Sequence, residues 1–313
     1  MAVWTTELAP PRPAAGKLAP VSHWRIHIGA HKTATTHLQQ TLAAIRPRLV
    51  EQGIDPIPLA ALRASGFARM LIERRLATRM PLVRGLAVRQ LVADALEPLR
   101  QGPRTLILSE EKLLGAPRRI FEEPAYPLVE QVVPRLATLG GKVTLFLSIR
   151  GFDRHLPSTY AQELRVLPPS DGGFEAIRRR VMERPPSWFE LVLRIRRAAP
   201  GVPLRVWRQE DYRAHREAIV ASLVGRATGP LPEIPVPVRT RSPSLEAIRL
   251  AEALPARLPV HERRARVDAI FAEGGEGTRF CPFTPTEEDR LQAAYADDMT
   301  RIAELDPSIL MRF

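Results

Sequence analysis

The stretch from His23 to Thr36 carries the residues with the clearest chemistry in the chain. Its sequence, HWRIHIGAHKTATT, begins with alternating apolar residues and continues into Gly29-x-x-Lys32-Thr33 and then a helical pattern. A turn whose amides point inward, followed at once by a helix N-terminus, offers unpaired N–H donors and partial positive charge to an anion. Lys32 adds a full charge. The stretch therefore predicts a binding site for a phosphorylated ligand.

The glycine spacing separates this loop from the usual mononucleotide loop. That loop reads Gly-x-x-x-x-Gly-Lys-Ser/Thr, whereas here a single glycine, Gly29, is separated from Lys32-Thr33 by two residues. The missing segment is the one that wraps the outer phosphates of a nucleoside triphosphate, so a single 5′-phosphate or a diphosphate-like group fits better than ATP. Followed by Thr35 and Thr36, the loop resembles the 5′-phosphosulfate loop of sulfotransferases that use 3′-phosphoadenosine-5′-phosphosulfate (PAPS), in particular their bacterial and glycan-modifying branch.

Two positions depart from the commonest form of that family. It has a proline where His31 stands and a glycine where Ala34 stands. We expect Ala34 to lie in the first turn of the following helix with a right-handed backbone, which alanine adopts readily, so that the loop closes without a positive φ. For His31 three roles are open: a neutral spacer, an extra donor to the sulfonate, or a surface residue.

A second element follows the most apolar strand pattern, Lys142–Ile149. Arg150 ends this strand, and a helical pattern then presents Ser158 near its start. A guanidinium can fork onto two phosphate oxygens while a hydroxyl donates to the third. The element resembles the segment with which the family binds the 3′-phosphate, and the resemblance implies that role for Arg150 and Ser158. A strand that ends in Arg and is followed by Ser is also common without any ligand.

A third element lies near the C-terminus, where glycines precede Thr278 and Arg279. Glycines allow backbone amides to approach a ligand closely. The segment resembles the C-terminal loop that closes over the nucleotide in the glycan-sulfotransferase branch, which implies contact of both residues with the 3′-phosphate side. A plain surface loop is the alternative, since Glu273 and Glu276 flank it. We expect Cys281, just after it, to be packed.

The resemblance also implies the chemistry. Sulfonyl transfer needs an in-line approach, a base for the acceptor proton and charge stabilisation at the leaving oxygen, which Lys32 would supply. We favour Glu110 as the base, because Ser109-Glu110-Glu111 follows an expected strand at the sheet edge where ligands bind. Capping of a helix or pairing with an arginine is the alternative role of Glu110. Further candidate bases are Glu111, Glu51 and Asp55.

The expected site residues fall into two groups. The catalytic residues are Lys32 and Glu110. The residues expected to bind the co-substrate PAPS are Gly29, His31, Lys32, Thr33, Ala34, Thr35, Thr36, Arg150, Ser158, Thr278 and Arg279. No metal is expected, because the family dispenses with one and the seven histidines are scattered, without His-Glu-x-x-His or paired-Asp spacing.

Alternating strands and helices must position these residues. Strands are expected at residues 23–28, 54–57, 104–108, 142–149 and 203–208, with the fourth at the centre of the sheet because its apolar run implies burial on both faces. Helical patterns cover 35–52, 59–100, broken at Pro81 and Gly85, and 286–305, and a Pro-rich connector covers 229–243. The resemblance implies an open, doubly wound α/β fold with a mostly parallel sheet of about five strands, a P-loop-like three-layer architecture.

The amino-acid composition limits the classes of protein to which this chain could belong. The chain has 313 residues, 45% of them hydrophobic, which suits a single α/β domain at 21–313 after a disordered Pro/Ala-rich tail at 1–20. It has one cysteine, which excludes an intramolecular disulfide and suits a reducing compartment, the cytoplasm by default. No apolar run reaches the roughly 18 residues of a membrane span.

The charge balance of +12, from 46 Lys and Arg against 34 Asp and Glu, favours anionic partners. Nucleic acid is not expected, because the arginine runs, such as 178–180 and 263–264, lack interleaved aromatic residues and fit solvated helix faces better. The partners expected are the sulfonyl donor and an acceptor that is a glycan or small molecule. Two alternatives stay open: a nucleotide-dependent kinase, which would need magnesium and ATP, and a basic binding protein without activity.

Overall fold

A computed structural model describes residues 21–72, 94–97, 105–235, 243–273 and 278–313. Within these residues the strands are β1 (His23–His27), β2 (Ile54–Pro56), β3 (Thr105–Ser109), β4 (Lys142–Ile149) and β5 (Leu204–Arg208). They form a five-stranded sheet in the order β2-β3-β1-β4-β5, and every neighbouring pair is parallel. The expected α/β fold with an open parallel sheet is confirmed.

The central strand is β1, which corrects the expectation that Lys142–Ile149 would hold the middle position. β1 pairs with β3 on one side and with β4 on the other. β4 is second from the edge, where β5 and two helical layers bury it as completely as a central strand would be buried. Along the chain, β2 and β3 are added on one side of β1, and β4 and β5 on the other. This reversal places a ligand crevice at the carboxyl end of β1.

The described helices connect and cover these strands. They are α1 (Thr35–Val50), α2 (Leu59–Ala64), α3 (Phe67–Ile72), α5 (Val129–Ala137), α6 (Phe152–Glu163), α7 (Gly173–Glu183), α8 (Trp188–Ala198), α9 (Gln209–Tyr212), α10 (Arg216–Val224), α11 (Leu245–Glu252), α12 (Val260–Glu273) and α13 (Pro285–Leu305), with 3₁₀ turns η2 (Glu111–Leu114) and η3 (Pro117–Phe121). Among the described residues, no helix is both long and apolar enough to cross a membrane.

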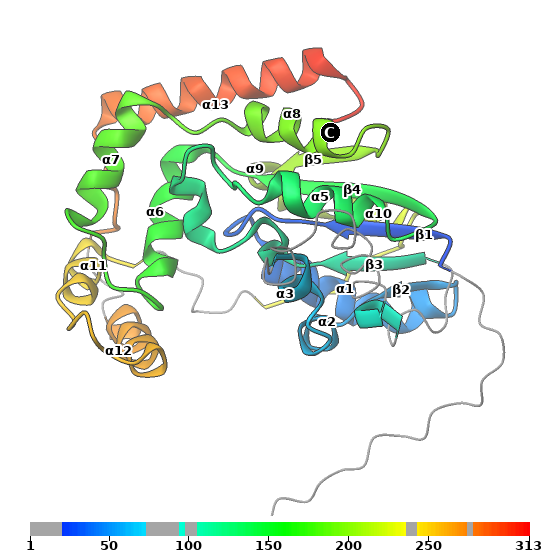
Figure 1. Cartoon of the computed structure of the whole chain (residues 1–313), viewed down its shortest axis with the longest axis horizontal. Helices are drawn as coiled ribbons and strands as arrows, with labels where there is room; N and C mark the ends of the chain where they lie inside the picture. Colours follow the sequence, from blue (N-terminus) through cyan, green and yellow to red (C-terminus); the bar gives the residue numbers. More distant parts are fainter. Residues whose placement is uncertain (1–20, 73–93, 98–104, 236–242, 274–277) are drawn as a thin grey trace, which may run out of the picture.

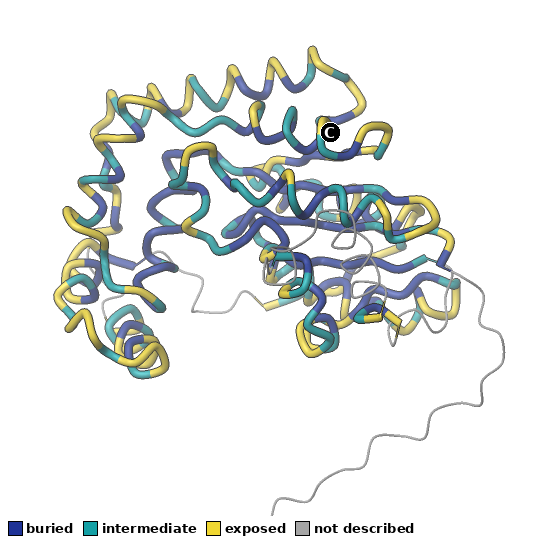
Figure 2. Tube along the Cα trace, viewed as in Figure 1, coloured by how far each residue is buried: buried dark blue, intermediate teal, exposed yellow. Residues whose placement is uncertain are grey.

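Two apolar cores sandwich the sheet. On one face α1 contributes a stripe at helical spacing, Leu38, Leu42, Ile45 and Leu49, which packs with α10 against residues such as Ile107, Phe146 and Trp207. The larger core, on the other face, joins the strands to α5 and α8. Figure 2 shows the strands buried between these layers and the exposed residues on the outer sides of the helices.

The sheet edge and the far end of the molecule have their own cover. Residues 309–311 run along the outer edge of β5, where Val206 N donates to Ile309 O at 2.7 Å and Met311 N donates to Val206 O at 2.8 Å. The edge is thus closed against pairing with another chain. In Figure 1, α13 lies along α8, and α7, α11 and α12 stand beside α6 at the end remote from β2.

Some expectations lie outside the described residues. They are the tail at 1–20, the breaks at Pro81 and Gly85, part of the Pro-rich connector and the glycines at 274, 275 and 277. The single-domain organisation stays a prediction. One arginine run is corrected: Arg263 is buried, because its guanidinium donates to the carbonyl of Pro255 at 2.8 Å and closes the turn before α12.

Candidate functional site

The loop between β1 and α1 is tied to β4 by its own backbone. Ala30 N donates to Ser148 O, and Ser148 N donates to Gly29 O, both at 2.6 Å. The Thr33 hydroxyl donates to Ala30 O at 2.6 Å. Thr33 is buried and is not among the residues that line the cleft described below, so it supports the loop. These bonds fix the backbone that presents Lys32.

Ala34 does not have the right-handed backbone that the sequence predicts. Its φ is 64° and its ψ is 20°, in the left-handed region, and Lys32 also has a positive φ of 61°. The chain must reverse direction between the anchored loop and α1, and this reversal overrides the helical preference of alanine. The left-handed backbone costs alanine about 1–2 kcal/mol. Ala34 stands where the resembling family has its glycine, which carries no such cost.

The start of α1 is left open to a ligand. Ala34 is the N-cap and supplies no capping side chain. In the described part of the chain, the amides of Thr35, Thr36 and His37 donate to no carbonyl and no side chain. Thr35 and Thr36 line the cleft. The helix therefore offers N–H donors and the positive end of its dipole at the cleft wall.

Lys32 is a largely buried cation with no ionic partner among the described residues. Burial, followed by the neighbouring charges of Arg165 and Arg150, lowers the pKa of its ammonium to about 8. Lys32 lines both the main cleft and a small adjoining pocket. A desolvated ammonium beside other cations is costly unless an anion compensates it. Such an arrangement would suit an anion.

Arg150 lies beside Lys32 at the end of β4. Its Nη1 donates to Lys32 O at 3.2 Å, and its own carbonyl accepts from Trp188 Nε1 at 2.9 Å. Burial lowers the pKa of its guanidinium, and the nearby Glu210 opposes this shift. No carboxylate lies within ion-pair distance of Arg150 in the described residues. Arg150 and Ser158 both line the cleft, so the expected pair is brought together.

The C-terminal loop contributes Arg279 to this cluster. Arg279 lines the small pocket with Lys32, Ser158 and Arg165, and an antiparallel bridge to Ser244 fixes its backbone. Thr278 is exposed and lines neither pocket. Cys281 is exposed, which corrects the expectation that it is packed. The loop turns outward after Phe280, whose buried ring packs against Phe174 at 5.3 Å between ring centroids.

The two carboxylates that follow β3 differ in their surroundings: Glu110 has a structural role, and Glu111 faces the cleft. Glu110 is fully buried, and both its oxygens accept from the Arg63 guanidinium, at 2.7 and 3.0 Å. It also accepts from Lys112 N at 3.2 Å and caps η2. Glu110 therefore has the Arg-paired, capping geometry and does not line the cleft.

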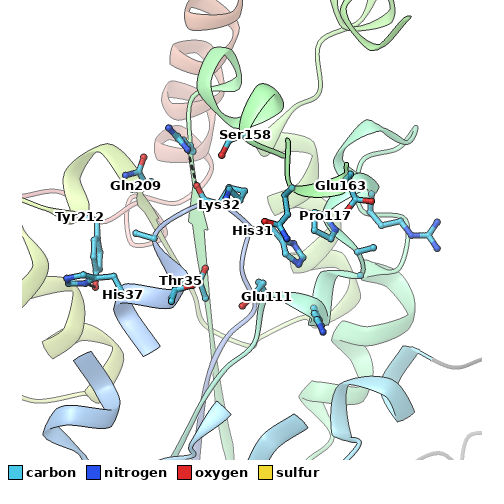
Figure 3. Close-up of a pocket in the computed structure, with 18 of the residues that line it drawn as sticks. His31, Lys32, Thr35, His37, Glu111, Pro117, Ser158, Glu163, Gln209 and Tyr212 are labelled. Carbon is cyan, nitrogen blue, oxygen red and sulfur yellow. Dashed lines mark hydrogen bonds between the residues drawn. The ribbon is translucent and has the colours of Figure 1, made fainter. Parts of the chain in front are cut away.

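Glu111 lines the cleft directly below the loop (Figure 3). Burial, and then the charge of Glu110, raise the pKa of its carboxyl. Its closeness explains Gly29, where an added Cβ would come within 3.3 Å of Glu111 Cα and Cβ. The other candidate bases are placed elsewhere: Glu51 is exposed, and Asp55 forms an ion pair with Arg46 at 2.7 Å.

The cleft has a volume of about 1720 Å³ and extends to both sides of Lys32. In Figure 3, Gln209, Tyr212 and His37 lie on one side, and His31, Pro117 and Glu163 on the other. The sequence did not predict the first group. His37 Nδ1 and the Tyr212 hydroxyl are hydrogen-bonded at 3.1 Å, and their rings meet edge to face. The sequence signal that could have identified Gln209 and Tyr212 as cleft residues is their position just after β5, at the carboxyl edge of the sheet.

A comparison with solved structures finds the crystal structure of a sulfotransferase from Alicyclobacillus acidocaldarius. It aligns over 92% of this chain and 96% of that chain, with a TM-score of 0.48 and 13% sequence identity. No protein-family model and no curated protein sequence matches the chain. A likeness this distant identifies no function. In the described residues, no group of three or more His, Cys, Asp or Glu side chains is arranged to hold a metal ion.

Proposed function

We propose that this protein is a sulfotransferase that moves the sulfonyl group of PAPS to a hydroxyl or amine acceptor, with a carbohydrate or glycoconjugate as the acceptor class. The observation that carries the proposal is the largely buried Lys32, which has no ionic partner in the described part of the chain. It lies between the open N-terminus of α1 and the cations Arg150 and Arg279. Positive charge is thus concentrated at two adjoining places. A nucleotide with phosphates at both its 5′ and 3′ positions has the matching charge distribution.

The donor is assigned to the loop and to the β5 side of the cleft. The amides of Thr35 and Thr36 and the ammonium of Lys32 would hold the 5′-phosphosulfate. Arg150, Ser158 and Arg279 would hold the 3′-phosphate, while the contribution of Thr278 stays a prediction. The rings of His37 and Tyr212 offer an aromatic wall to the base.

The reaction then needs only groups that face the cleft. The acceptor oxygen or nitrogen attacks sulfur in line as the bond between sulfur and the bridging oxygen breaks. Lys32 stabilises the negative charge that develops on that oxygen. Glu111 takes the acceptor's proton, and we propose it in place of Glu110, which is fully buried, is bound twice by Arg63 at 2.7 and 3.0 Å and does not line the cleft. Arg63 reaches Glu111 at the longer distance of 3.4 Å. The raised pKa of Glu111 suits a base that holds a proton after transfer. The products are adenosine 3′,5′-bisphosphate and the sulfated acceptor.

Calorimetric titration with adenosine 3′,5′-bisphosphate tests the proposal, with ATP plus magnesium as the competing ligand. We expect the bisphosphate to bind more tightly than ATP. We expect Lys32→Ala to weaken bisphosphate binding about 10- to 100-fold, the cost of one charge-assisted contact. Lys142→Ala is the matched control, because Lys142 is exposed at the opposite, amino end of β4. Preference for ATP would favour a kinase, and equal affinity after loss of Lys32 would contradict the assigned loop.

A further inference from the structure

His31 is a buried polar side chain that faces the cleft with no partner. The residue is 7% exposed and lines the cleft next to Lys32. Neither ring nitrogen has a hydrogen-bond partner in the described residues. Its backbone follows Ala30, which is anchored to β4, so the ring is presented from a fixed position. Buried polar atoms are normally hydrogen-bonded, which leaves a ligand or water to satisfy this ring.

The environment of His31 determines its protonation state, and with it which acceptor groups the ring can bind. Burial, and then Lys112, Lys32 and Arg63, lower the pKa of the imidazole to about 3, so the ring is neutral at physiological pH. A neutral imidazole offers one N–H donor and one acceptor nitrogen. A hydroxyl can satisfy either. An ammonium can satisfy only the acceptor nitrogen, because it has no lone pair for the N–H.

More buried polar atoms without a hydrogen-bond partner in the described residues lie on α6. His155, Thr159 and Glu163 are spaced four residues apart and share one face of this helix. Both ring nitrogens of His155, the Thr159 hydroxyl and Glu163 Oε2 are buried and have no hydrogen-bond partner in the described residues. Glu163 Oε2 nevertheless forms an ion pair with Arg118 Nη1 at 3.6 Å, and Arg118 opposes the rise in the pKa of Glu163 that burial causes. Of the three, Glu163 reaches the cleft, and Figure 3 places it on the side of His31.

We propose that His31 and Glu163 form the acceptor subsite, which binds neighbouring hydroxyl groups of a polyhydroxylated, sugar-like acceptor and not an amine. The proposal rests on the proposed function, because Lys32 beside His31 marks the sulfonyl group. His31 holds the attacking hydroxyl in line with that group, and Glu163 accepts a hydrogen bond from a second hydroxyl. His31 is thus an acceptor-binding residue rather than a donor-binding one.

Transfer from ³⁵S-labelled PAPS to two ring compounds of similar size tests the subsite. Methyl β-glucoside supplies hydroxyls and cyclohexylamine supplies an amine. The proteins are the wild type, His31→Ala, His31→Asn and the matched control His261→Asn, which alters an exposed histidine outside the cleft. Steady-state kinetics give KM for donor and acceptor separately, and calorimetry gives the affinity for adenosine 3′,5′-bisphosphate.

We expect at least about tenfold faster transfer to the glucoside than to the amine. His31→Ala should lower kcat/KM for the glucoside about 100-fold, with donor KM and bisphosphate affinity changed by less than about twofold. His31→Asn, whose amide also donates and accepts, should recover about tenfold of this loss. His261→Asn should match the wild type.

Three results would overturn the subsite. The first is faster transfer to the amine than to the glucoside, and the second is a rise in the donor KM of His31→Ala as large as its loss of transfer. The third is that the wild type hydrolyses PAPS to sulfate but transfers nothing to the glucoside. In each case bisphosphate binding would leave the proposed function in place. Failure of the wild type to bind the bisphosphate would reject the proposed function itself, and the subsite with it.

Discussion

Ala34→Gly should stabilise this protein, although glycine destabilises the interior of a helix. Ala34 has a φ of 64° at the N-cap of α1. Glycine adopts this backbone without the contact between Cβ and the carbonyl that costs alanine about 1–2 kcal/mol. Against this gain stands the larger entropy of glycine in the unfolded chain, about 0.5–1 kcal/mol. The net stabilisation is about 0.5–1 kcal/mol.

The corresponding shift in melting temperature is small but measurable. Unfolding entropy is about 2.1 cal/mol/K per residue, so a chain of 313 residues has roughly 0.66 kcal/mol/K. The expected rise in Tm is therefore about 0.8–1.5 °C. Ala44→Gly provides a control with the opposite sign, because Ala44 is an exposed residue in the interior of the same helix. There glycine costs about 1 kcal/mol and should lower Tm by about 1.5 °C.

Scanning calorimetry of the wild type and the two variants measures the difference. The result that refutes the reasoning is a lowered Tm in both variants, which would mean that the backbone at Ala34 is right-handed in solution. Because Ala34→Gly preserves the loop, its affinity for adenosine 3′,5′-bisphosphate should equal that of the wild type by calorimetric titration.

Three further predictions concern the site. Glu111→Gln should reduce sulfonyl transfer at least tenfold in rate assays, with unchanged bisphosphate affinity. Glu110→Gln should instead lower the unfolding free energy in thermal melts by about 1–2 kcal/mol, because Arg63 loses a buried partner but is itself 41% exposed. The reverse pattern would return the role of base to Glu110. Arg150→Ala should weaken bisphosphate binding about 10- to 100-fold and leave binding of adenosine 5′-phosphosulfate within about threefold, so equal losses for both ligands would contradict its assignment to the 3′-phosphate. The pKa of Lys32 is lowered to about 8, so the ammonium is charged below that pH and neutral above it. The affinity for the bisphosphate should therefore hold from about pH 7 to 8 and fall at higher pH. Constant affinity up to about pH 10 in titrations would argue against a binding role for this cation.

The sequence predicted the strands well because their signals are local. The apolar run Lys142–Ile149 lies between a glycine pair and Arg150, and the structure has β4 with the same bounds. The position of that strand in the sheet was predicted wrongly, since burial on both faces does not distinguish the central strand from its neighbour.

The failures within the site come from contacts between distant segments. Glu110 and Glu111 are adjacent, and Arg63, 47 residues before Glu110 on α2, contacts both, Glu110 at 2.7 Å and Glu111 at 3.4 Å. Their roles differ because Glu110 is fully buried and caps η2, whereas Glu111 lines the cleft. His37 meets Tyr212 across 175 residues. At Ala34, local helix propensity pointed to a right-handed backbone, and the hydrogen bonds that tie Ala30 to β4 impose the opposite one. Residue type and spacing could predict the strand, loop and helix around Lys32, but not which neighbours would neutralise each charge.

The central claim is that Lys32 and the cations around it hold a nucleotide whose sulfonyl group is transferred. The most direct measurement is a single-turnover reaction of the wild type with ³⁵S-labelled PAPS, with and without magnesium, beside a parallel reaction with γ-³²P-labelled ATP. We predict release of the ³⁵S label from the nucleotide without a magnesium requirement, no transfer from ATP, and loss of the reaction in Lys32→Ala. Magnesium-dependent transfer of the ³²P label, with PAPS left intact, would contradict it.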